Sequence, residues 1–138
     1  MKNYEFIEHT ADIGIKVKGT TLKALFHNSA SAMFNIIAKK RRAAKTFEKP
    51  IEIKQEADNL DELFINWLNE LLSLSATKEL IFSDFKIQSL TEKKLQAVAI
   101  GSPVNEFELN TEIKAATYHA LKINKGKFGW QAEVIFDV

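Results

Sequence analysis

The sequence contains no cysteine, and this absence excludes disulfides, thiolate zinc sites and a thiol nucleophile, leaving oxygen and imidazole as metal ligands. An excess of either charge is also missing, because 19 basic residues stand against 18 acidic ones. The net charge of +1 gives no sign of a general nucleic-acid binder. Direct nucleic-acid binding is therefore not expected, and any connection to RNA must come through a partner or a local patch.

Long apolar runs and catalytic signatures are missing as well. The first residues, MKNYEFIEH, become charged at once, so neither a signal peptide nor a membrane span is predicted and a cytoplasmic protein is expected. The five glycines form neither a phosphate-binding loop nor a dinucleotide fingerprint, and the three histidines lack metalloprotease spacing. With 46% apolar residues among 138, residues 1–138 are expected to form a single domain.

Two amphipathic helices are predicted. The first follows Thr20 or Thr21 as N-cap, and the second follows Asp58 or Asn59. His27 falls on the polar side of the first helix, which indicates a surface histidine. The apolar stripes are Leu22, Leu25, Phe26, Met33, Phe34 and Ile37 in the first helix, and Leu60, Leu63, Phe64, Trp67, Leu68, Leu71 and Leu72 in the second.

Apolar residues that alternate with polar or small ones predict strands around residues 4–6, 13–17 and 51–53, and hairpins of 85–90 with 95–100 and of 121–124 with 130–136. The fold class is therefore α+β, with two amphipathic helices packed against a mixed or mostly antiparallel β-sheet. A shift of 38 positions pairs Ile15 with Ile53 and Phe26 with Phe64. This spacing indicates a possible duplicated strand-helix unit.

A basic run follows the first helix: Lys39, Lys40, Arg41, Arg42 and Lys45. Its position is suited to complement the negative end of the helix dipole. Two interpretations are open, a solvated helix end with a loop and an RNA-binding patch.

Carboxylates gather at the C-terminus. Asp137 and the terminal carboxylate of Val138 end an apolar strand, and if Asp12 in the turn before residue 13 approaches them, three hard oxygen donors converge. Such donors suit calcium or magnesium and do not suit zinc. The alternative is that these acids are simply solvated. Lys114 is the natural cationic partner of such a cluster.

The residues that follow Lys114 have a second interpretation. Thr117, Tyr118 and His119 can form a buried hydrogen-bonded group that orders a strand.

Four stretches together resemble the hallmark blocks of the archease family, in the same order and at similar separations: HTADIGI from His9, WLNELL from Trp67, EIKAATYH from Glu112 and the closing IFDV. They span the whole chain. One position departs from the family pattern, because the family has aspartate before the histidine and this sequence has Glu8. That exchange keeps the charge and lengthens the side chain.

The resemblance implies a protein cofactor of the RtcB-type tRNA-splicing ligase, which is not itself an enzyme. Such a cofactor promotes transfer of guanylate from GTP to the ligase histidine and permits repeated turnover. By the same resemblance, the divalent-cation site falls on Asp12, Asp137 and Val138, and the essential lysine falls on Lys114. Calcium is the expected ion, and magnesium and manganese are alternatives. His9, Glu8 and His119 are expected to support this site.

Two other functions are alternatives. One is a stand-alone metal-dependent phosphohydrolase, with Asp12, Asp137 and His119 around the ion. The other is a chaperone-like partner of a tRNA-modifying enzyme.

Overall fold

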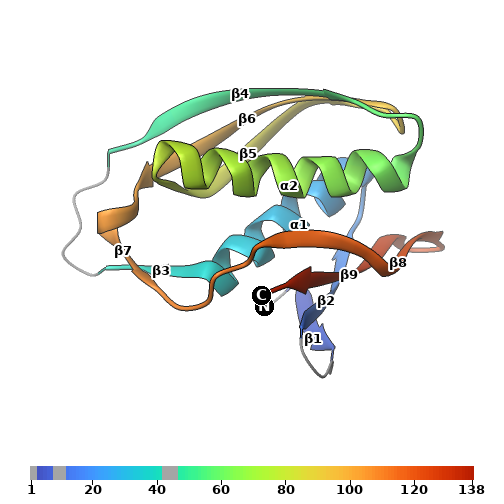
Figure 1. Cartoon of the computed structure of the whole chain (residues 1–138). Helices are drawn as coiled ribbons and strands as arrows, with labels where there is room; N and C mark the ends of the chain where they lie inside the picture. Colours follow the sequence, from blue (N-terminus) through green and yellow to red (C-terminus); the bar gives the residue numbers. More distant parts are fainter. Residues whose placement is uncertain (1–2, 8–11, 42–46) are drawn as a thin grey trace.

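Two helices lie between two antiparallel sheets in the computed structural model (Figure 1). The sheets have the strand orders β1-β2-β9-β8 and β4-β6-β5, and a further small sheet pairs β3 with β7. The structure describes residues 3–7, 12–41 and 47–138. The elements are β1 (Tyr4–Ile7), β2 (Ile13–Gly19), α1 (Leu22–Ile37), β3 (Ala38–Lys40), β4 (Lys49–Glu56), α2 (Leu60–Lys78), β5 (Leu80–Leu90), β6 (Lys94–Pro103), the 3₁₀ helix η1 (Val104–Glu106), β7 (Phe107–Leu109), β8 (Ala115–Gly126) and β9 (Gly129–Asp137).

Both helices begin where a side chain caps the first turn. The Thr21 hydroxyl accepts a hydrogen bond from the Ala24 amide at 3.0 Å, and the Asn59 side chain accepts one from the Glu62 amide at 2.9 Å. Of the alternatives for the N-caps, Thr21 and Asn59 are thus the correct ones. Helix α2 ends at Glu79, whose left-handed backbone (φ 55°) stops the helix. None of the helices in the described ranges is long and apolar enough to span a membrane.

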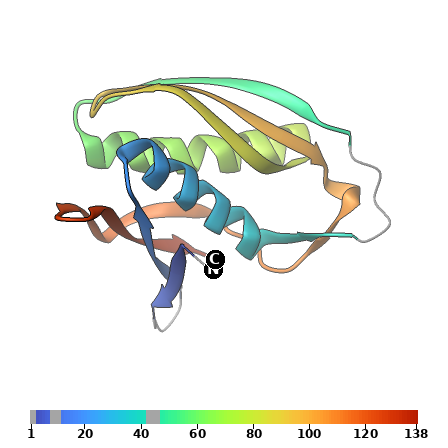
Figure 2. The ribbon, with the colours of Figure 1, turned by 180° about the vertical axis from the view of Figure 1, so that it is seen from behind.

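The predicted apolar stripes form the core between the sheets. Phe26 of α1 and Phe64 of α2 are fully buried, and their rings meet edge to face with centroids 5.3 Å apart. Trp67 is also fully buried, and its indole nitrogen donates to the Phe26 carbonyl at 3.0 Å. This hydrogen bond satisfies a polar group that would otherwise be costly in the core. Viewed from behind, α1 lies in front of α2, below the β4-β6-β5 sheet (Figure 2).

The internal repeat extends further than the strand and helix that the sequence indicates. The segment β4-α2-β5-β6 forms a sheet of order β4-β6-β5, and β2-α1-β8-β9 forms one of order β2-β9-β8. Each is a βαββ unit whose last strand lies in the middle. The β4-α2-β5-β6 unit is inserted into the β2-α1-β8-β9 unit, between α1 and β8. The N-caps Thr21 and Asn59 are 38 positions apart, which is the shift that aligns the two sequences.

The basic run after the first helix does not have the predicted structure. Helix α1 ends at Ile37 with no basic residue in its last turn, so the basic run begins after the helix, and its effect on the helix dipole stays a prediction. Lys39 and Lys40 lie in strand β3 instead of a loop, because this segment pairs with β7, distant in sequence. Arg42 and Lys45 lie outside the described residues.

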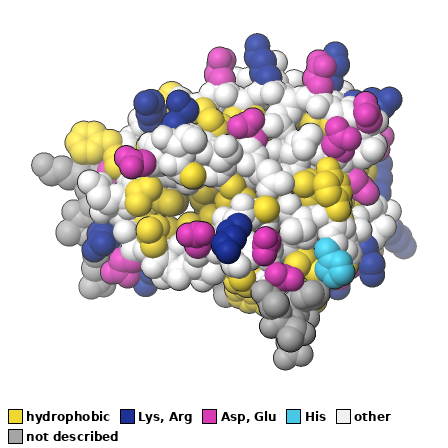
Figure 3. Space-filling model, in the orientation of Figure 1, with side chains coloured by type: hydrophobic (Ala, Val, Ile, Leu, Met, Phe, Trp, Pro, Cys, Tyr) yellow, Lys and Arg dark blue, Asp and Glu magenta, His cyan; other side chains and the backbone are white. Residues whose placement is uncertain are grey.

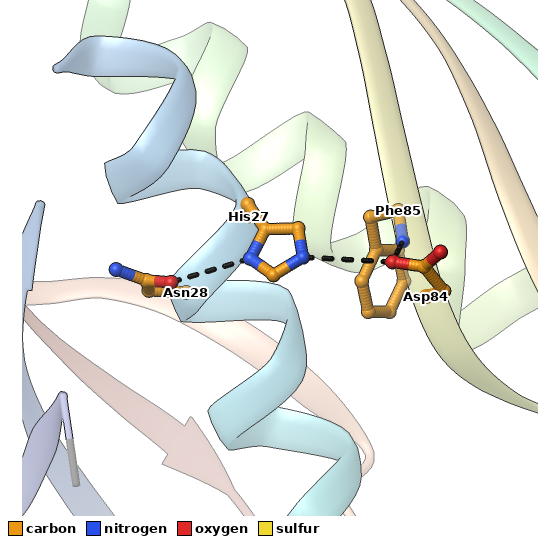
Figure 4. Close-up of polar contacts among 4 residues, drawn as sticks. All are labelled: His27, Asn28, Asp84 and Phe85. Carbon is orange, nitrogen blue, oxygen red and sulfur yellow. Dashed lines mark hydrogen bonds and ion pairs between the residues drawn. The ribbon is translucent and has the colours of Figure 1, made fainter. Parts of the chain in front are cut away.

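His27 is a partly exposed surface histidine, as predicted. Its Nδ1 lies 3.2 Å from Asn28 Oδ1 and its Nε2 lies 3.7 Å from Asp84 Oδ1 (Figure 4). The ring also packs edge to face on Phe85, with centroids 6.0 Å apart. These contacts connect α1 to β5 and give His27 a structural role.

Candidate functional site

The register of β2 and β9 places the two candidate aspartates side by side. The last pair of this antiparallel ladder is Ile13 with Phe136, so the next residues along the chain are Asp12, in the bend just before β2, and Asp137, the last residue of β9. Ile15 and its partner Val134 are fully buried toward the helices. Because side chains alternate between the faces of a strand and Phe136 is fully buried, Asp137 belongs to the outer face of the sheet, and Asp12 lies in the bend beside it.

Strand β8 brings Lys114 to the same end of the sheet. Ala115 pairs with Asp137, and the Lys114 amide donates to the Asp137 carbonyl at 2.8 Å. Val138 follows directly and is 37% exposed. We call this end of the sheet, with Asp12, Lys114, Asp137 and Val138, the acidic end. It unites three segments that are far apart in the sequence.

Asn69 of α2 fixes the backbone beside Lys114. Its amide group donates to the Ala116 carbonyl at 3.1 Å and accepts from the Ala116 amide at 2.7 Å. Ala116 is only 4% exposed, so both backbone groups need these partners. The Asn69 side chain thereby provides the hydrogen bonds of a neighbouring strand and holds the start of β8 against α2.

A groove of about 590 Å³ lies next to Lys114, between α2 and the segment that leads into β8. Figure 3 shows apolar side chains around a hollow on this face, below α2. Lys114 itself is exposed at the rim. The groove is lined by Asn69, Leu72, Ser73, Ala76, Glu112, Ile113, Lys114 and Ala115.

The chemistry of the acidic end matches a hard cation. All three predicted ligands are carboxylates, the donors that calcium and magnesium prefer. Among the described residues, no group of three or more histidine, cysteine, aspartate or glutamate side chains could hold a metal ion. The cation site on Asp12, Asp137 and Val138 therefore stays a prediction. Glu8 and His9, the predicted supporting residues, lie outside the described ranges.

His119 and its neighbours occupy an irregular part of β8. The pairing with β9 is interrupted between Thr117 and Lys122, and within this bulge Ala120 has a positive φ of 54°. Tyr118 and His119 are exposed, so the interpretation of Thr117–His119 as a buried group is wrong for these two. It holds in part for Thr117, whose hydroxyl donates to the Ile135 carbonyl at 2.8 Å. The register does not place His119 beside Asp137.

The bulge faces the first turn of α2. Partial burial raises the pKa of Tyr118 above its usual 10.0, and the carboxylates of Glu62 and Asp61 raise it further. The phenol therefore stays neutral over the physiological pH range.

The structure thus brings together Asp12, Asp137, Val138 and Lys114. It also identifies Asn69, a residue that sequence reasoning missed. The signal was present, because Asn69 lies within the stretch WLNELL. An asparagine among leucines at helical spacing, however, does not reveal that its partner is the backbone of residue 116.

The chain matches the model of the archease protein family (MTH1598/TM1083) over residues 4–138. It is 38% identical to the protein archease of Pyrococcus abyssi, with all of both chains covered. It is 37% identical to that of Methanosarcina acetivorans, over 99% of this chain and 97% of the relative.

Two solved structures have a similar fold. The solution structure of Methanobacterium thermoautotrophicum protein 1598 superposes with a TM-score of 0.75 at 32% identity, over 100% of both chains. The crystal structure of an archease and possible chaperone from Thermotoga maritima superposes with a TM-score of 0.65 at 27% identity, over 96% of this chain and 94% of the other. The expected α+β class is confirmed.

Proposed function

Because this chain belongs to the archease family, we propose that it activates an RtcB-type tRNA-splicing RNA ligase without being an enzyme itself. It promotes GTP-dependent guanylylation of the ligase histidine, and so permits multiple turnover in tRNA splicing and RNA repair. The observation that supports this proposal is the register that places Asp12, Asp137, Val138 and Lys114 at one end of one sheet.

In this proposal, Asp12, Asp137 and the terminal carboxylate of Val138 hold a divalent cation. Calcium is the first choice, because its oxygen coordination tolerates irregular geometry, and magnesium or manganese are alternatives. When bound, the cation supplies positive charge that offsets the charge of phosphate oxygens. The carboxylates keep this charge at the surface of the acidic end, where a partner can approach it.

Lys114 provides a second positive charge beside the carboxylates. Its backbone is held by the Asp137 carbonyl, and the Asn69 hydrogen bonds fix Ala116 two residues further on. The side chain is exposed, so its ammonium group can reach a phosphate or a carboxylate of the ligase as a mobile point charge. The fixed backbone reduces the entropy that is lost when this contact forms.

A ligation assay with limiting ligase tests the proposal. With the wild-type protein, we expect several moles of ligated RNA per mole of ligase. With Asp137→Lys, product should stop near one equivalent, because one negative charge at the acidic end is replaced by a positive charge. Glu52→Lys is the matched control, since Glu52 is an exposed acid on β4 in the other sheet. If Asp137→Lys stimulates the ligase as well as Glu52→Lys does, with an unchanged circular dichroism spectrum, the proposal is wrong.

A C-terminal extension tests the cation separately. Two glycines added after Val138 move the terminal carboxylate away while both aspartates stay in place. We expect calcium affinity, measured by titration calorimetry, to fall about tenfold or more, because one of three anionic ligands is lost. An affinity equal to that of the wild type would exclude Val138 as a ligand.

A second candidate function, chaperone-like binding of partner proteins, is supported by two observations. The Thermotoga maritima relative is described as a possible chaperone. In addition, Phe6, Phe47 and Leu109 are each more than 60% exposed, and such side chains can contact apolar segments of a partner. This function predicts that the protein suppresses aggregation of a heated client enzyme, and that Asp137→Lys leaves this suppression unchanged. Loss of ligase stimulation in the same variant would assign the acidic end to the ligase alone.

A further inference from the structure

The end of this sheet opposite to the acidic end carries basic side chains. The nine-residue strand β9 starts at Gly129 in the β8-β9 hairpin and ends at Asp137, so the two ends are about 26 Å apart. In Figure 1 the hairpin projects on the right, away from the C-terminus. We call this end, with Lys18, Asn124, Lys127, Phe128 and Gln131, the basic end.

The basic end contains a surface pocket of about 680 Å³. Strand β2 contributes Lys18, and the hairpin contributes Lys127, Phe128 and Trp130. None of the described residues that line it is acidic. The charged side chains that line this pocket are therefore all lysines. They concentrate positive potential at one place, although the net charge of the protein is only +1.

Aromatic rings lie among these lysines. Phe128 is 88% exposed, an unusual position for a large apolar side chain. The Lys127 ammonium lies 5.8 Å from the centre of the Phe128 ring, and the Lys125 ammonium lies 5.7 Å from that of Trp130. The hairpin therefore presents cations and aromatic faces side by side, the combination that binds phosphates and stacks bases.

Polar side chains of three strands lie next to this turn on the outer face of the sheet, opposite to the face of Trp130 and Lys125. Gln131 of β9 is the register partner of Lys18 on β2 and of Asn124 on β8. The three side chains therefore form a row on the outer face of the sheet. Amides both donate and accept hydrogen bonds, as the edges of nucleic-acid bases do.

The hairpin is held firmly against the rest of the fold. Gly129 has a φ of 127°, and a Cβ there would lie 2.6 Å from the Gly19 carbonyl oxygen and 2.9 Å from Thr20 Cα. The backbones of β9 and of the β2-α1 connection therefore touch. The backbone of Lys18 is fixed as well, because its carbonyl accepts a hydrogen bond from the side-chain amide of Asn28 at 2.8 Å. The charged and aromatic groups thus have a fixed base, which lowers the entropic cost of binding.

From these observations we propose that the basic end binds single-stranded nucleic acid, with RNA as the probe of choice. Phe128 stacks on a base, Lys18 and Lys127 contact phosphates, and Asn124 and Gln131 contact base edges. An open site with an exposed ring suits a strand that continues past it, whereas a free nucleotide needs an enclosing pocket. The net charge of the whole chain argues against general nucleic-acid binding, but a net charge averages over both ends of this sheet.

Fluorescence anisotropy with a labelled twelve-nucleotide single-stranded RNA tests the proposal. At low salt we expect saturable binding by the full chain. Phe128→Ala should weaken binding about fivefold or more, because one stacking contact is lost. The doubly reversed variant Lys18→Glu/Lys127→Glu should weaken it at least tenfold and flatten the salt dependence, because fewer phosphate contacts release counterions. The matched controls are Phe47→Ala, 66% exposed, and Lys54→Glu on β4, and both should bind like the wild type.

Several results would overturn this assignment. One is the absence of RNA binding at 50 mM salt and about 100 μM protein, and another is equal weakening by the control variants. Equal displacement of the RNA by polyglutamate would indicate an acidic protein segment as the ligand instead. Equal displacement by GTP at the same nucleotide concentration would indicate a mononucleotide site. Because Asp137→Lys changes only the far end, it should leave RNA binding unchanged, so this test is independent of ligase activation.

Discussion

Replacing Asn69 with alanine tests whether α2 holds the start of β8 in place. The substitution removes two hydrogen bonds, of 2.7 and 3.1 Å, to the backbone of Ala116. Ala116 is 4% exposed, so its amide and carbonyl are left without partners in a site that water reaches poorly. Each such buried group costs about 1–3 kcal/mol, and the two together are expected to cost about 2–6 kcal/mol.

One effect acts in the opposite direction. Alanine is a better helix former than asparagine by about 0.6 kcal/mol, so the net loss of unfolding free energy should be about 1–5 kcal/mol. With a urea dependence of about 2 kcal/mol per molar, the unfolding midpoint should fall by about 0.5–2.5 M. This is a large share of the roughly 5–15 kcal/mol that stabilises a domain.

Asn66→Ala is the matched control, because it makes the same exchange one turn earlier on α2. No hydrogen bond between described side chains involves Asn66, so this variant should be as stable as the wild type or slightly more stable. Hydrogen exchange gives a second measurement, since the Ala116 amide should lose protection in Asn69→Ala alone. If the two variants unfold within about 0.5 kcal/mol of each other, the clamp does not contribute to stability and the reasoning fails.

Three further predictions follow from single contacts. Gly129→Ala should destabilise the fold by about 1–3 kcal/mol in thermal unfolding, because a φ of 127° and the nearby Gly19 carbonyl both oppose a Cβ at this position. An unchanged melting temperature would contradict this prediction. Trp67→Phe should cost about 1–3 kcal/mol in urea unfolding, because a buried carbonyl of α1 loses its donor at 3.0 Å, and a neutral effect would show that water replaces the indole. In a Tyr4→Phe background, Tyr118 should ionise above pH 10.0 by absorbance at 295 nm, because its pKa is raised. The raised pKa means that the folded state keeps the Tyr118 proton longer than the unfolded state does, so the free energy of unfolding should fall as the pH rises beyond 10. Ionisation of Tyr118 at or below pH 10 would refute its placement near Asp61 and Glu62.

Local patterns predicted most of the fold. Both amphipathic helices, their N-caps and both hairpins follow from residue spacing, although β5 and β8 begin several residues earlier than predicted. These features depend on interactions between residues close in the chain, which a sequence displays directly. The small β3-β7 sheet was not predicted, because three-residue strands have almost no periodicity and this pair joins Ala38–Lys40 to Phe107–Leu109.

The candidate site was predicted in part. The residue types at Asp12, Asp137 and Val138 indicated hard-cation chemistry with Lys114 as a cationic partner, and the resemblance to a family made Lys114 the essential lysine. The basic end was not predicted, because Lys18 and Lys127 are separated by more than a hundred residues and each looks like an ordinary solvated lysine. Only the register of β2 with β9 and of β8 with β9 brings them into one surface.

The sequence by itself determined which segments become helices and hairpins, that the chain repeats a strand and a helix after 38 positions, and which side chains carry the chemistry. Tertiary structure alone decided that one βαββ unit is inserted into the other, so that β2 near the start of the chain and β9 at its end become neighbouring strands. The physical reason is that pairing between distant strands depends on hydrogen bonds and buried apolar faces contributed by both partners. The register of two paired strands cannot be read from the sequence of either strand alone. This register places the acidic end and the basic end at opposite ends of one sheet.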